Sequence, residues 1–314
     1  MPELGYALSS EEHGPDDLVD YAVRAESVGF EHALLSDHYH PWVRRQGESP
    51  FVWSTLGGIA RETESLQVGT GVTCPIKRLH PALVAQASAT AASMFDDRFF
   101  LGVGTGENLN EHVVGGRWPP HPERLAMLEE AVGIIRDLWT GEERSHHGEY
   151  FDVENATLFT VPDETPPLYV AAGGETTAAV VDDLGDGLIG TAPDESLLDA
   201  YDGDGPRYGQ VTVCWAETDA EARRQAHEHW PNVATPGSLG QELRTPAHFE
   251  QVAELISEDD VAGSMTCSAD ADDHVDAIQL FADAGYDHVY VHQVGPNQDG
   301  FFDFYEEEVL PSFS

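Results

Sequence analysis

A short polar segment at the end of an apolar run concentrates several side chains that could do chemistry. SDHYHPW, at residues 36–42, holds two histidines, an aspartate and a tryptophan, and it directly follows the apolar run HALLS at 32–36. A short run of this kind is typical of a buried strand. Histidine can take up a proton near neutral pH. We therefore predict that His38 is a base and that Trp42 forms the wall of a pocket for proton and hydride transfer.

A second polar cluster follows a later apolar run. GTGEN at 104–108 comes directly after FFLGV, and Glu107 is followed closely by Asn110. The segment is not a phosphate-binding P-loop, because it lacks the Lys–Ser/Thr pair of that motif. We predict that Glu107 is an acid in the same pocket. Glycines end several other apolar runs as well, which indicates that a flat or bulky ligand approaches the backbone there.

Metal binding is the first alternative for the histidine segment. A His-x-His pair after a barrel strand can bind zinc in hydrolases, and a catalytic zinc needs a third protein ligand. His292 or Glu107 could supply that ligand. We favour proton and hydride chemistry over a metal-dependent hydrolase and predict no metal at this site.

Cations are rare in this chain, so paired cations stand out. Arg44-Arg45 and Lys77-Arg78 follow the second and third apolar runs, and Lys77 is the only lysine. Guanidinium and ammonium groups bind phosphate and carboxylate groups well. We predict that the two pairs hold an anionic ligand.

Eight apolar runs, most of them followed by a helical pattern, must position these residues. The runs lie at 4–9, 32–36, 66–72, 99–106, 168–174, 186–191, 210–217 and 288–293. Helical patterns cover 16–28, 52–63, 81–94 and 122–139. This alternation predicts a (β/α)8 TIM barrel, in which active sites lie at the C-terminal ends of the strands. A doubly wound sheet is the alternative, but no GxGxxG motif follows the first run.

Two segments interrupt the alternation. EYFDVENATLF predicts a hairpin insertion near 142–160, and PNVATPGSLGQELRTP predicts an insertion over the barrel mouth near 231–262. We therefore expect a single domain over 1–314 with two insertions.

The charge of the chain is extreme. Lys and Arg total 15 against 57 Asp and Glu, which gives a formal net charge of -42. Such a chain repels itself in dilute buffer and is screened in molar salt, so we predict an acidic, halophilic protein. Binding to nucleic acid is not expected, because it needs basic patches. No apolar run is long enough to span a membrane and no signal sequence is evident, so we expect a cytoplasmic protein.

The motifs SDHYHPW, LQVGTGVTCP, FFLGVGTGENLNE and LYVAAGG together resemble the luciferase-like flavin and deazaflavin superfamily. Within it, the sequence is similar to the F420-dependent glucose-6-phosphate dehydrogenase branch, and we expect a haloarchaeal-type member. The resemblance implies a TIM barrel with insertions, a homodimer, and coenzyme F420 as cofactor. It also implies a non-proline cis peptide at Gly71–Val72 that supports the deazaflavin ring.

The resemblance assigns roles to individual residues. His38 would take the proton of a substrate hydroxyl as hydride leaves for the deazaflavin C5, Trp42 would pack beside the reacting carbon, and Glu107 would protonate the reduced ring. The implied cofactor contacts are Asp37, Gly71, Val72, Cys74, Gly104, Asn110, Ala172, Gly173, Gly174 and Thr191.

The substrate-phosphate site of that branch is not matched. Its cationic positions correspond to Asp194, Gly263 and Asp299 or Gly300, none of which is basic. We therefore predict a neutral alcohol or its carbonyl product as substrate, and not glucose 6-phosphate. The alternatives are a luciferase-like monooxygenase that uses FMN and a barrel that binds a cofactor without catalysis.

Overall fold

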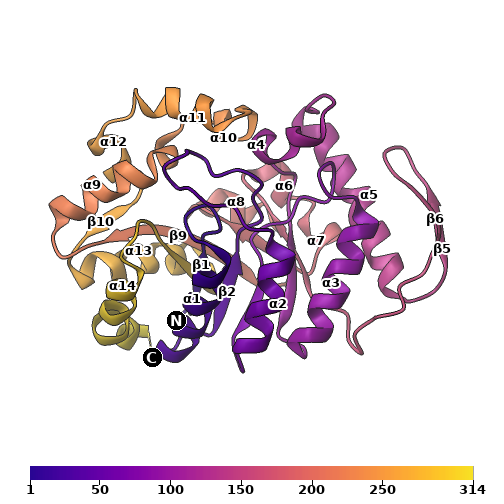
Figure 1. Ribbon diagram of the computed structural model, residues 1–314, viewed down its shortest axis with the longest axis horizontal. Coiled ribbons are helices and arrows are strands. Elements are labelled where there is room, and N and C mark those ends of the chain that lie inside the picture. The colour runs from indigo at the N-terminus through magenta and orange to yellow at the C-terminus, as the bar shows by residue number, and fades with distance from the viewer. Residues whose placement is uncertain (314) are drawn as a thin grey trace.

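The computed structural model describes residues 1–313, and its centre is a closed parallel barrel (Figure 1). The barrel strands are β1 (Glu3–Leu8), β2 (His32–Leu35), β3 (Gln67–Thr70), β4 (Phe99–Val103), β7 (Leu168–Ala171), β8 (Gly187–Gly190), β9 (Arg207–Trp215) and β11 (His288–Gln293). They pair in this order, and β9 pairs with both β8 and β11, which closes the ring. A further strand, β10 (Thr266–Ser268), pairs with the second half of β9. The predicted (β/α)8 barrel is confirmed.

Helices surround the barrel on its outer face. The longer ones are α1 (Pro15–Val28), α2 (Val52–Glu62), α3 (Pro81–Phe95), α5 (His121–Trp139), α9 (Asp219–His229) and α13 (Ala271–Ala284). The shorter ones are α4 (Asn108–Glu111), η1 (His112–Val114), α6 (Glu175–Ala178), α7 (Val181–Leu184), α8 (Glu195–Asp199), η2 (Pro231–Ala234), α10 (Leu239–Glu242), α11 (Pro246–Ala253), α12 (Glu258–Ala262), α14 (Gln298–Phe304), η3 (Tyr305–Val309) and η4 (Leu310–Phe313). The four helices predicted from apolar spacing all form, with ends within two residues of those expected.

Helix α1 illustrates how the outer layer is specified. Leu18, Ala22, Ala25 and Val28 recur at helical spacing, and all four are buried. Gly29 ends the helix with a φ of 108°, and its N–H donates to the carbonyl of Ala25. Burial of a side chain such as Leu18 is worth about 1.5–3 kcal/mol, so packing against the barrel stabilises the helix.

The barrel interior is packed with aromatic rings below the strands' C-terminal ends. Phe100 and Tyr208 stack with centroids 5.8 Å apart, and Tyr169 lies 4.7 Å from Tyr208. Tyr290 belongs to the same cluster. At Gly69 an added Cβ would collide with the Phe100 ring, so only glycine leaves room for that ring. These rings fill the interior of the barrel.

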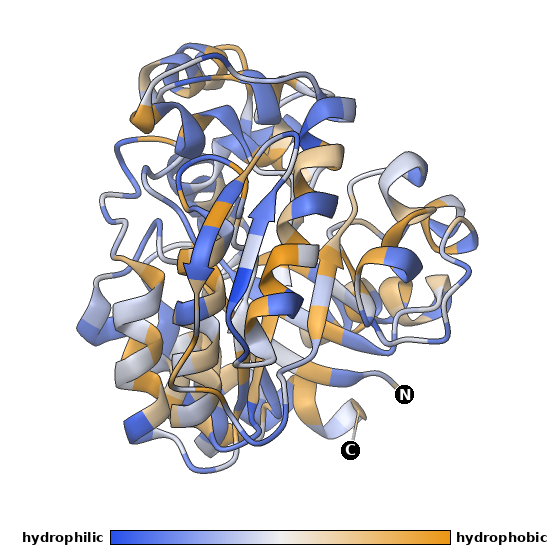
Figure 2. Cartoon of the chain, turned by 90° about the vertical axis from the view of Figure 1, so that its right-hand side faces the viewer, coloured by the Kyte–Doolittle hydropathy of each residue, from blue (hydrophilic) through white to orange (hydrophobic). Residues whose placement is uncertain are grey.

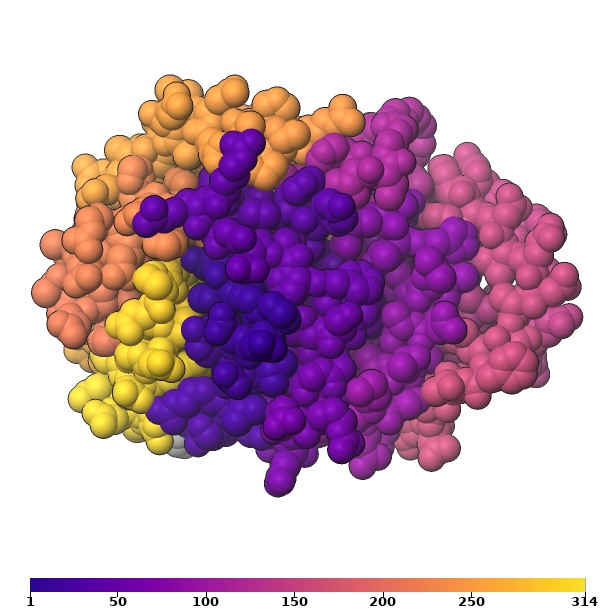
Figure 3. Space-filling view, in the orientation of Figure 1, coloured from indigo at the N-terminus to yellow at the C-terminus, as the bar shows by residue number. Residues whose placement is uncertain are grey.

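Two segments lie outside the regular alternation. β5 (Arg144–His147) and β6 (Asp152–Ala156) form an antiparallel hairpin on the outside of the barrel (Figures 1 and 2). Residues 231–262 hold η2, α10, α11 and α12, which lie across one end of the molecule, in orange in Figure 3. Within residues 1–313, no helix has both the length and the apolar composition to cross a membrane.

Candidate active site

A cavity of about 920 Å³ opens at the C-terminal ends of the strands, beneath the segment 231–262. Every residue that the sequence analysis predicted to be catalytic or to contact the cofactor lines it. These residues are Asp37, His38, Trp42, Gly71, Val72, Cys74, Gly104, Glu107, Asn110, Ala172, Gly173, Gly174 and Thr191. They come from the loops after β2, β3, β4, β7 and β8, so the barrel brings five separate segments together.

His38 is held with one ring nitrogen facing acidic groups. Its Nδ1 lies 3.1 Å from the carbonyl oxygen of His40, so Nδ1–H donates there. Its Nε2 lies 3.3 Å from Oε1 of Glu11 and 3.5 Å from Oε2 of Glu107. In the neutral ring this leaves the Nε2 lone pair free to accept a proton, and the carboxylates are placed to stabilise the resulting charge.

The surroundings shift the pKa values of the three groups in different directions. Burial lowers the pKa of His38, but Glu11 and Glu107 outweigh it and raise the pKa above the usual value. Burial raises the pKa of Glu11, but His38 and the Ser36 hydroxyl lower it overall. Burial raises the pKa of Glu107, and there His38 only partly opposes the shift. Glu11 therefore stays ionised more readily than Glu107, which is the better proton donor.

The sequence analysis missed Glu11. Its Oε2 accepts hydrogen bonds from Ser36, at 2.5 Å, and from Ser9, at 3.2 Å, so the loop after β1 is tied to the loop after β2. The available signal was its place directly after the first apolar run, because acids at strand ends face the mouth of a parallel barrel.

Asn110 joins the two predicted polar clusters. Its Oδ1 accepts from the backbone N–H of Tyr39, at 2.9 Å, and of His40, at 3.3 Å. Its Nδ2 donates to Oε2 of Glu107, at 3.1 Å. The amide thereby fixes the segment that carries His38 relative to Glu107.

Trp42 lies between His38 and the segment over the mouth. Its ring centroid is 5.0 Å from that of His38 and 5.1 Å from that of Phe249, on α11. Its backbone N–H donates to Oε1 of Gln46, at 2.8 Å. The indole is therefore a wall of the cavity that connects the histidine to the insertion.

The prediction that the paired cations hold an anionic ligand is wrong. Arg44 and Arg45 are 67% and 59% exposed and form surface ion pairs with Glu250 and Glu228, respectively. Lys77 donates to the backbone carbonyls of Glu111, at the end of α4, and of Gly115, after η1. None of these three side chains lines the cavity as described over residues 1–313.

Arg78 has a structural role behind the cavity. Its Nη2 donates to Oδ1 of Asp37 at 2.8 Å, and its backbone N–H donates to Oε2 of Glu111 at 2.6 Å. Thr73 donates to the other oxygen of Asp37, at 2.8 Å. Burial raises the pKa of Glu111 to about 7, with Arg78 opposing the rise. This buried network fixes Asp37 at the end of β2.

The predicted non-proline cis peptide is present. The Gly71–Val72 peptide is cis, as the family resemblance implied. Gly104 lies against this segment, where an added Cβ would come within 2.8 Å of Val72 Cγ2. Burial raises the pKa of Cys74 well above its usual range, so its thiol is protonated at neutral pH.

The glycines after β7 face open space. An added Cβ would meet no atom within 4 Å at Gly174, and at Gly173 the nearest would be Nε2 of Gln241, at 3.9 Å. Backbone amides at such a position are accessible to an anionic group of a ligand.

The residues matched by sequence to a substrate-phosphate site lie in different parts of the structure. Asp194 lines the cavity, but Gly263, Asp299 and Gly300 do not. Gly263 follows α12 on the outside, and Asp299 lies in the first turn of α14. Among the described residues that line the cavity, none is lysine or arginine.

The first loop also buries Glu12 near His292. Burial raises the pKa of Glu12 to about 8 and lowers that of His292 to about 4, so the carboxyl keeps the proton. The Glu12 Oε2 and His292 Nε2 atoms are 3.9 Å apart, and the N–H of Gly295 donates to the other Glu12 oxygen, at 3.0 Å. Of this neutral pair, His292 lines the cavity.

The sequence matches the luciferase-like monooxygenase family over residues 1–288. The chain belongs to this luciferase-like family. It is 34% identical, over 98% of its length and 96% of the relative's, to an F420-dependent glucose-6-phosphate dehydrogenase of Microbacterium testaceum.

Solved structures agree with this assignment. An F420-dependent secondary alcohol dehydrogenase in complex with an F420–acetone adduct superposes with a TM-score of 0.90 at 28% identity, covering 99% of both chains. The oxygenating constituent of 3,6-diketocamphane monooxygenase from Pseudomonas putida, in complex with FMN, has a TM-score of 0.71 at 17% identity, covering 99% of this chain and 98% of that one. The second likeness concerns the fold alone.

Proposed function

We propose that this luciferase-like protein is a coenzyme F420-dependent oxidoreductase that transfers hydride between an alcohol, or its carbonyl product, and the deazaflavin C5. The observation that carries the proposal is His38 Nε2, which faces the cavity 3.3 Å from Glu11 and 3.5 Å from Glu107. An alcohol gives up hydride readily only as its O–H proton is removed, so a base must reach that oxygen.

The cavity residues fit a flat cofactor with an anionic tail. The cis Gly71–Val72 segment and Gly104 would support the ring, while Gly173 and Gly174 would receive the tail through their backbone amides. Asp37, Cys74, Ala172 and Thr191, with Asn110, complete the proposed contacts. When bound, coenzyme F420 supplies the acceptor and donor of the hydride.

The chain's own residues would handle the protons. His38 Nε2 accepts the proton of the substrate hydroxyl as the C–H bond breaks, and Glu11 stabilises the imidazolium that results. Glu107, whose pKa burial raises, supplies the proton that balances the transferred hydride. Trp42 excludes water beside the reacting carbon. In the reverse direction each proton transfer is reversed.

The charge of the cavity favours a neutral substrate. Its lining includes the carboxylates of Glu11, Glu107 and Asp194 but, among the described residues, no lysine or arginine. A phosphate monoester would meet negative charge without a compensating cation. We therefore propose a neutral alcohol or carbonyl compound, and not glucose 6-phosphate.

An FMN-dependent monooxygenase is the second candidate. It is supported by the family match and by the likeness of fold to an FMN-containing oxygenase. This chemistry would consume oxygen, which hydride transfer to a deazaflavin does not.

The deciding experiment compares the two cofactors directly. The purified protein is titrated in molar KCl with oxidised coenzyme F420 and with FMN, and binding is followed by fluorescence. We expect tight binding of coenzyme F420 alone, followed by bleaching of its absorbance when neutral alcohols are added. Preferred binding of FMN, with oxygen uptake, would overturn the proposal.

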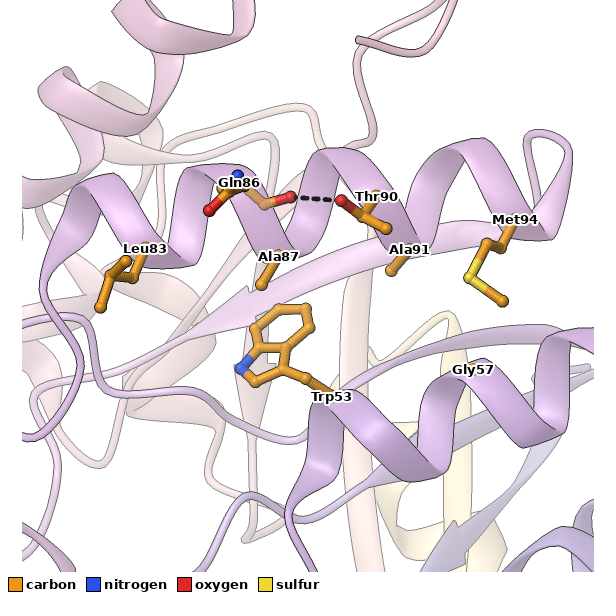
Figure 4. Close-up of a pocket in the computed structure, with 8 residues that line it drawn as sticks. All are labelled: Trp53, Gly57, Leu83, Gln86, Ala87, Thr90, Ala91 and Met94. Atoms are coloured by element: carbon orange, nitrogen blue, oxygen red, sulfur yellow. Dashed lines mark hydrogen bonds between the residues drawn. The ribbon is translucent and has the colours of Figure 1, made fainter. Parts of the chain in front are cut away.

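We also propose a homodimer that forms through the face between α2 and α3. A groove of about 250 Å³ separates these helices, with Trp53 on one side and the exposed side chains of Leu83 and Met94 on the other (Figure 4). Exposed apolar side chains around a groove are typical of interfaces. Sedimentation in molar KCl should give a dimer for the native chain and a monomer for Leu83→Glu; a native monomer would contradict the proposal.

Location in the cytoplasm is also proposed. All three cysteines, Cys74, Cys214 and Cys267, are free thiols. Free thiols are typical of reducing compartments.

A further inference from the structure

A second group of side chains with metal-ligand chemistry lies at the opposite end of the barrel from the cavity. Glu3, His32 and His288 each occupy the first position of a strand, β1, β2 and β11, respectively. These strands are adjacent, and Glu3 lies directly opposite His288 in the β1–β11 register. Because the N-terminal ends of parallel strands meet at one end of the barrel, the three side chains converge on its floor.

The three groups are close enough to share one ion. Oε2 of Glu3 lies 2.9 Å from Nε2 of His32 and 3.1 Å from Nδ1 of His288, and all three atoms are within 4.8 Å of one another. Ligand atoms about 2.0–2.2 Å from a tetrahedral zinc are roughly 3.4 Å apart. The Glu3 carboxylate would therefore need to move away from each histidine by only a few tenths of an ångström.

Hydrogen bonding among these residues leaves polar atoms without partners. Nδ1 of His32 and Nδ1 of His288 are both buried and have no hydrogen-bond partner. The His288 nitrogen approaches the Glu3 carboxylate at 3.1 Å without hydrogen-bond geometry. A cation between them would satisfy both the imidazole lone pair and the carboxylate oxygen.

We propose that Glu3, His32 and His288 bind one divalent transition-metal ion, such as Zn²⁺, with water completing its coordination. Two imidazole nitrogens and one carboxylate oxygen suit such an ion better than Mg²⁺ or Ca²⁺, which prefer oxygen ligands. The Glu3 side chain is 52% exposed, whereas those of His288 and His32 are 16% and 5% exposed. The ion can therefore enter from solvent and keep at least one water ligand.

The position of the site indicates a structural role. β1 and β11 are the first and last strands of the barrel, and their pairing joins the two ends of the chain (Figure 1). An ion held by Glu3, His32 and His288 would cross-link both strands and β2. Tyr208 stacks on the His288 ring, with centroids 4.3 Å apart and planes 14° apart, and so holds that ligand in place.

The test uses the full-length, tag-free protein after treatment with a chelator. Zn²⁺ is titrated calorimetrically, Co²⁺ is used as a visible-absorption probe of tetrahedral nitrogen and oxygen ligation, and the melting temperature is measured with and without Zn²⁺. We expect about one ion per chain, a tetrahedral Co²⁺ spectrum and a higher melting temperature with metal. Glu3→Gln should weaken Zn²⁺ binding at least tenfold and abolish the rise in melting temperature.

Glu3→Gln is the decisive variant, because this side chain is half exposed and its loss leaves the buried histidines in place. His32→Gln should have the same effect, provided that circular dichroism shows a folded chain. The control is His147→Gln, which removes an exposed histidine that also contacts a carboxylate, Asp152, on the β5–β6 hairpin. Unchanged Zn²⁺ affinity in Glu3→Gln, binding that is lost only in His38→Ala, or no binding by the native chain would each overturn the proposal.

Discussion

His38 can act as a base because its two ring nitrogens have different partners. Nδ1–H donates to a carbonyl, and Nε2 faces the cavity. His38→Ala should lower kcat by about 10²–10⁴-fold and leave the dissociation constant of coenzyme F420 nearly unchanged. The measurements are steady-state bleaching of the coenzyme and fluorescence titration, with His147→Gln as the control. A large loss of coenzyme binding would instead make His38 a cofactor ligand.

Glu11 sets the proton affinity of that base. Burial lowers the pKa of His38, while the carboxylate of Glu11 is the largest influence that raises it, followed by Glu107. A base must be neutral to accept a proton, so alcohol oxidation is lost as pH falls below the pKa of His38. In Glu11→Gln the pKa of His38 should be lower. The fall of kcat/KM on the acid side of the pH profile (the acid limb) should therefore move to lower pH.

The control for that measurement is Glu228→Gln, which removes an exposed carboxylate that pairs with Arg45. Its acid limb should match that of the native enzyme. An acid limb in Glu11→Gln that stays in place or moves to higher pH would show that Glu11 does not act on His38.

At the scale of elements, the loop after β1 is joined to the loop after β11 through Glu12. The Glu12 carboxyl accepts the N–H of Gly295 and faces His292, His229 and the charge of Glu11. Burial, reinforced by Glu11 and partly opposed by the Gly295 N–H, raises its pKa to about 8, against 4.5 for an ordinary glutamate. Between these two pH values the folded chain holds a proton that the unfolded chain has released.

Stability contributed by Glu12 should therefore fall as pH rises from about 4.5 to about 8. Glu12→Gln keeps an acceptor for Gly295 but cannot ionise. Relative to the native chain, the unfolding free energy of this variant should increase by roughly 4 kcal/mol between pH 5 and pH 8.5. Guanidinium unfolding at the two pH values measures this difference. A pH-independent difference between the two chains would show that Glu12 is already ionised in the fold.

The strands, and the placing of His38 and Glu107 at the barrel mouth, could be derived from local sequence patterns, whereas the individual cofactor contacts were implied only by the family resemblance. A strand such as β4 is a short apolar run, and the residues after it must lie at the barrel mouth. Pairings between distant segments could not be derived in this way. Arg44 and Arg45 bind acids 206 and 183 residues away, on α11 and α9, and no local pattern predicts those contacts. The place of Glu11 after the first apolar run indicated that it faces the mouth, but its contact with Ser36, on another loop, could not be derived locally.

Helix ends, too, follow from local patterns, whereas the places of residues near the mouth do not. Gly29 and Gly285 end α1 and α13 with φ of 108° and 112°, and glycine after an amphipathic pattern predicts such an end. By contrast, no local pattern indicates that Asp194 lines the cavity and that Gly263 and Asp299 do not. Only the folded barrel shows which of these residues line the cavity.

The acids of the whole molecule are spread over its surface and not confined to the cavity. Helix α12 begins with Glu258, Asp259 and Asp260, and α13 and η3 also begin with several acids. With a formal charge of -42, the compact state brings these carboxylates closer together than the unfolded chain does. Screening by salt should therefore stabilise the folded chain selectively.

The melting temperature should rise by at least about 5 °C between 0.1 M and 2 M KCl, because the Debye length falls from about 10 Å at 0.1 M to about 3 Å at 1 M. Differential scanning calorimetry over a KCl series measures the change. Salts and osmolytes also stabilise proteins by exclusion from the surface, so sucrose of matched osmolality is the control. If repulsion between carboxylates is the cause, the melting temperature should rise steeply at low KCl concentration, and sucrose should not reproduce that rise. Equal effects of KCl and sucrose would contradict the halophilic assignment and leave the acidic surface without a role in salt dependence.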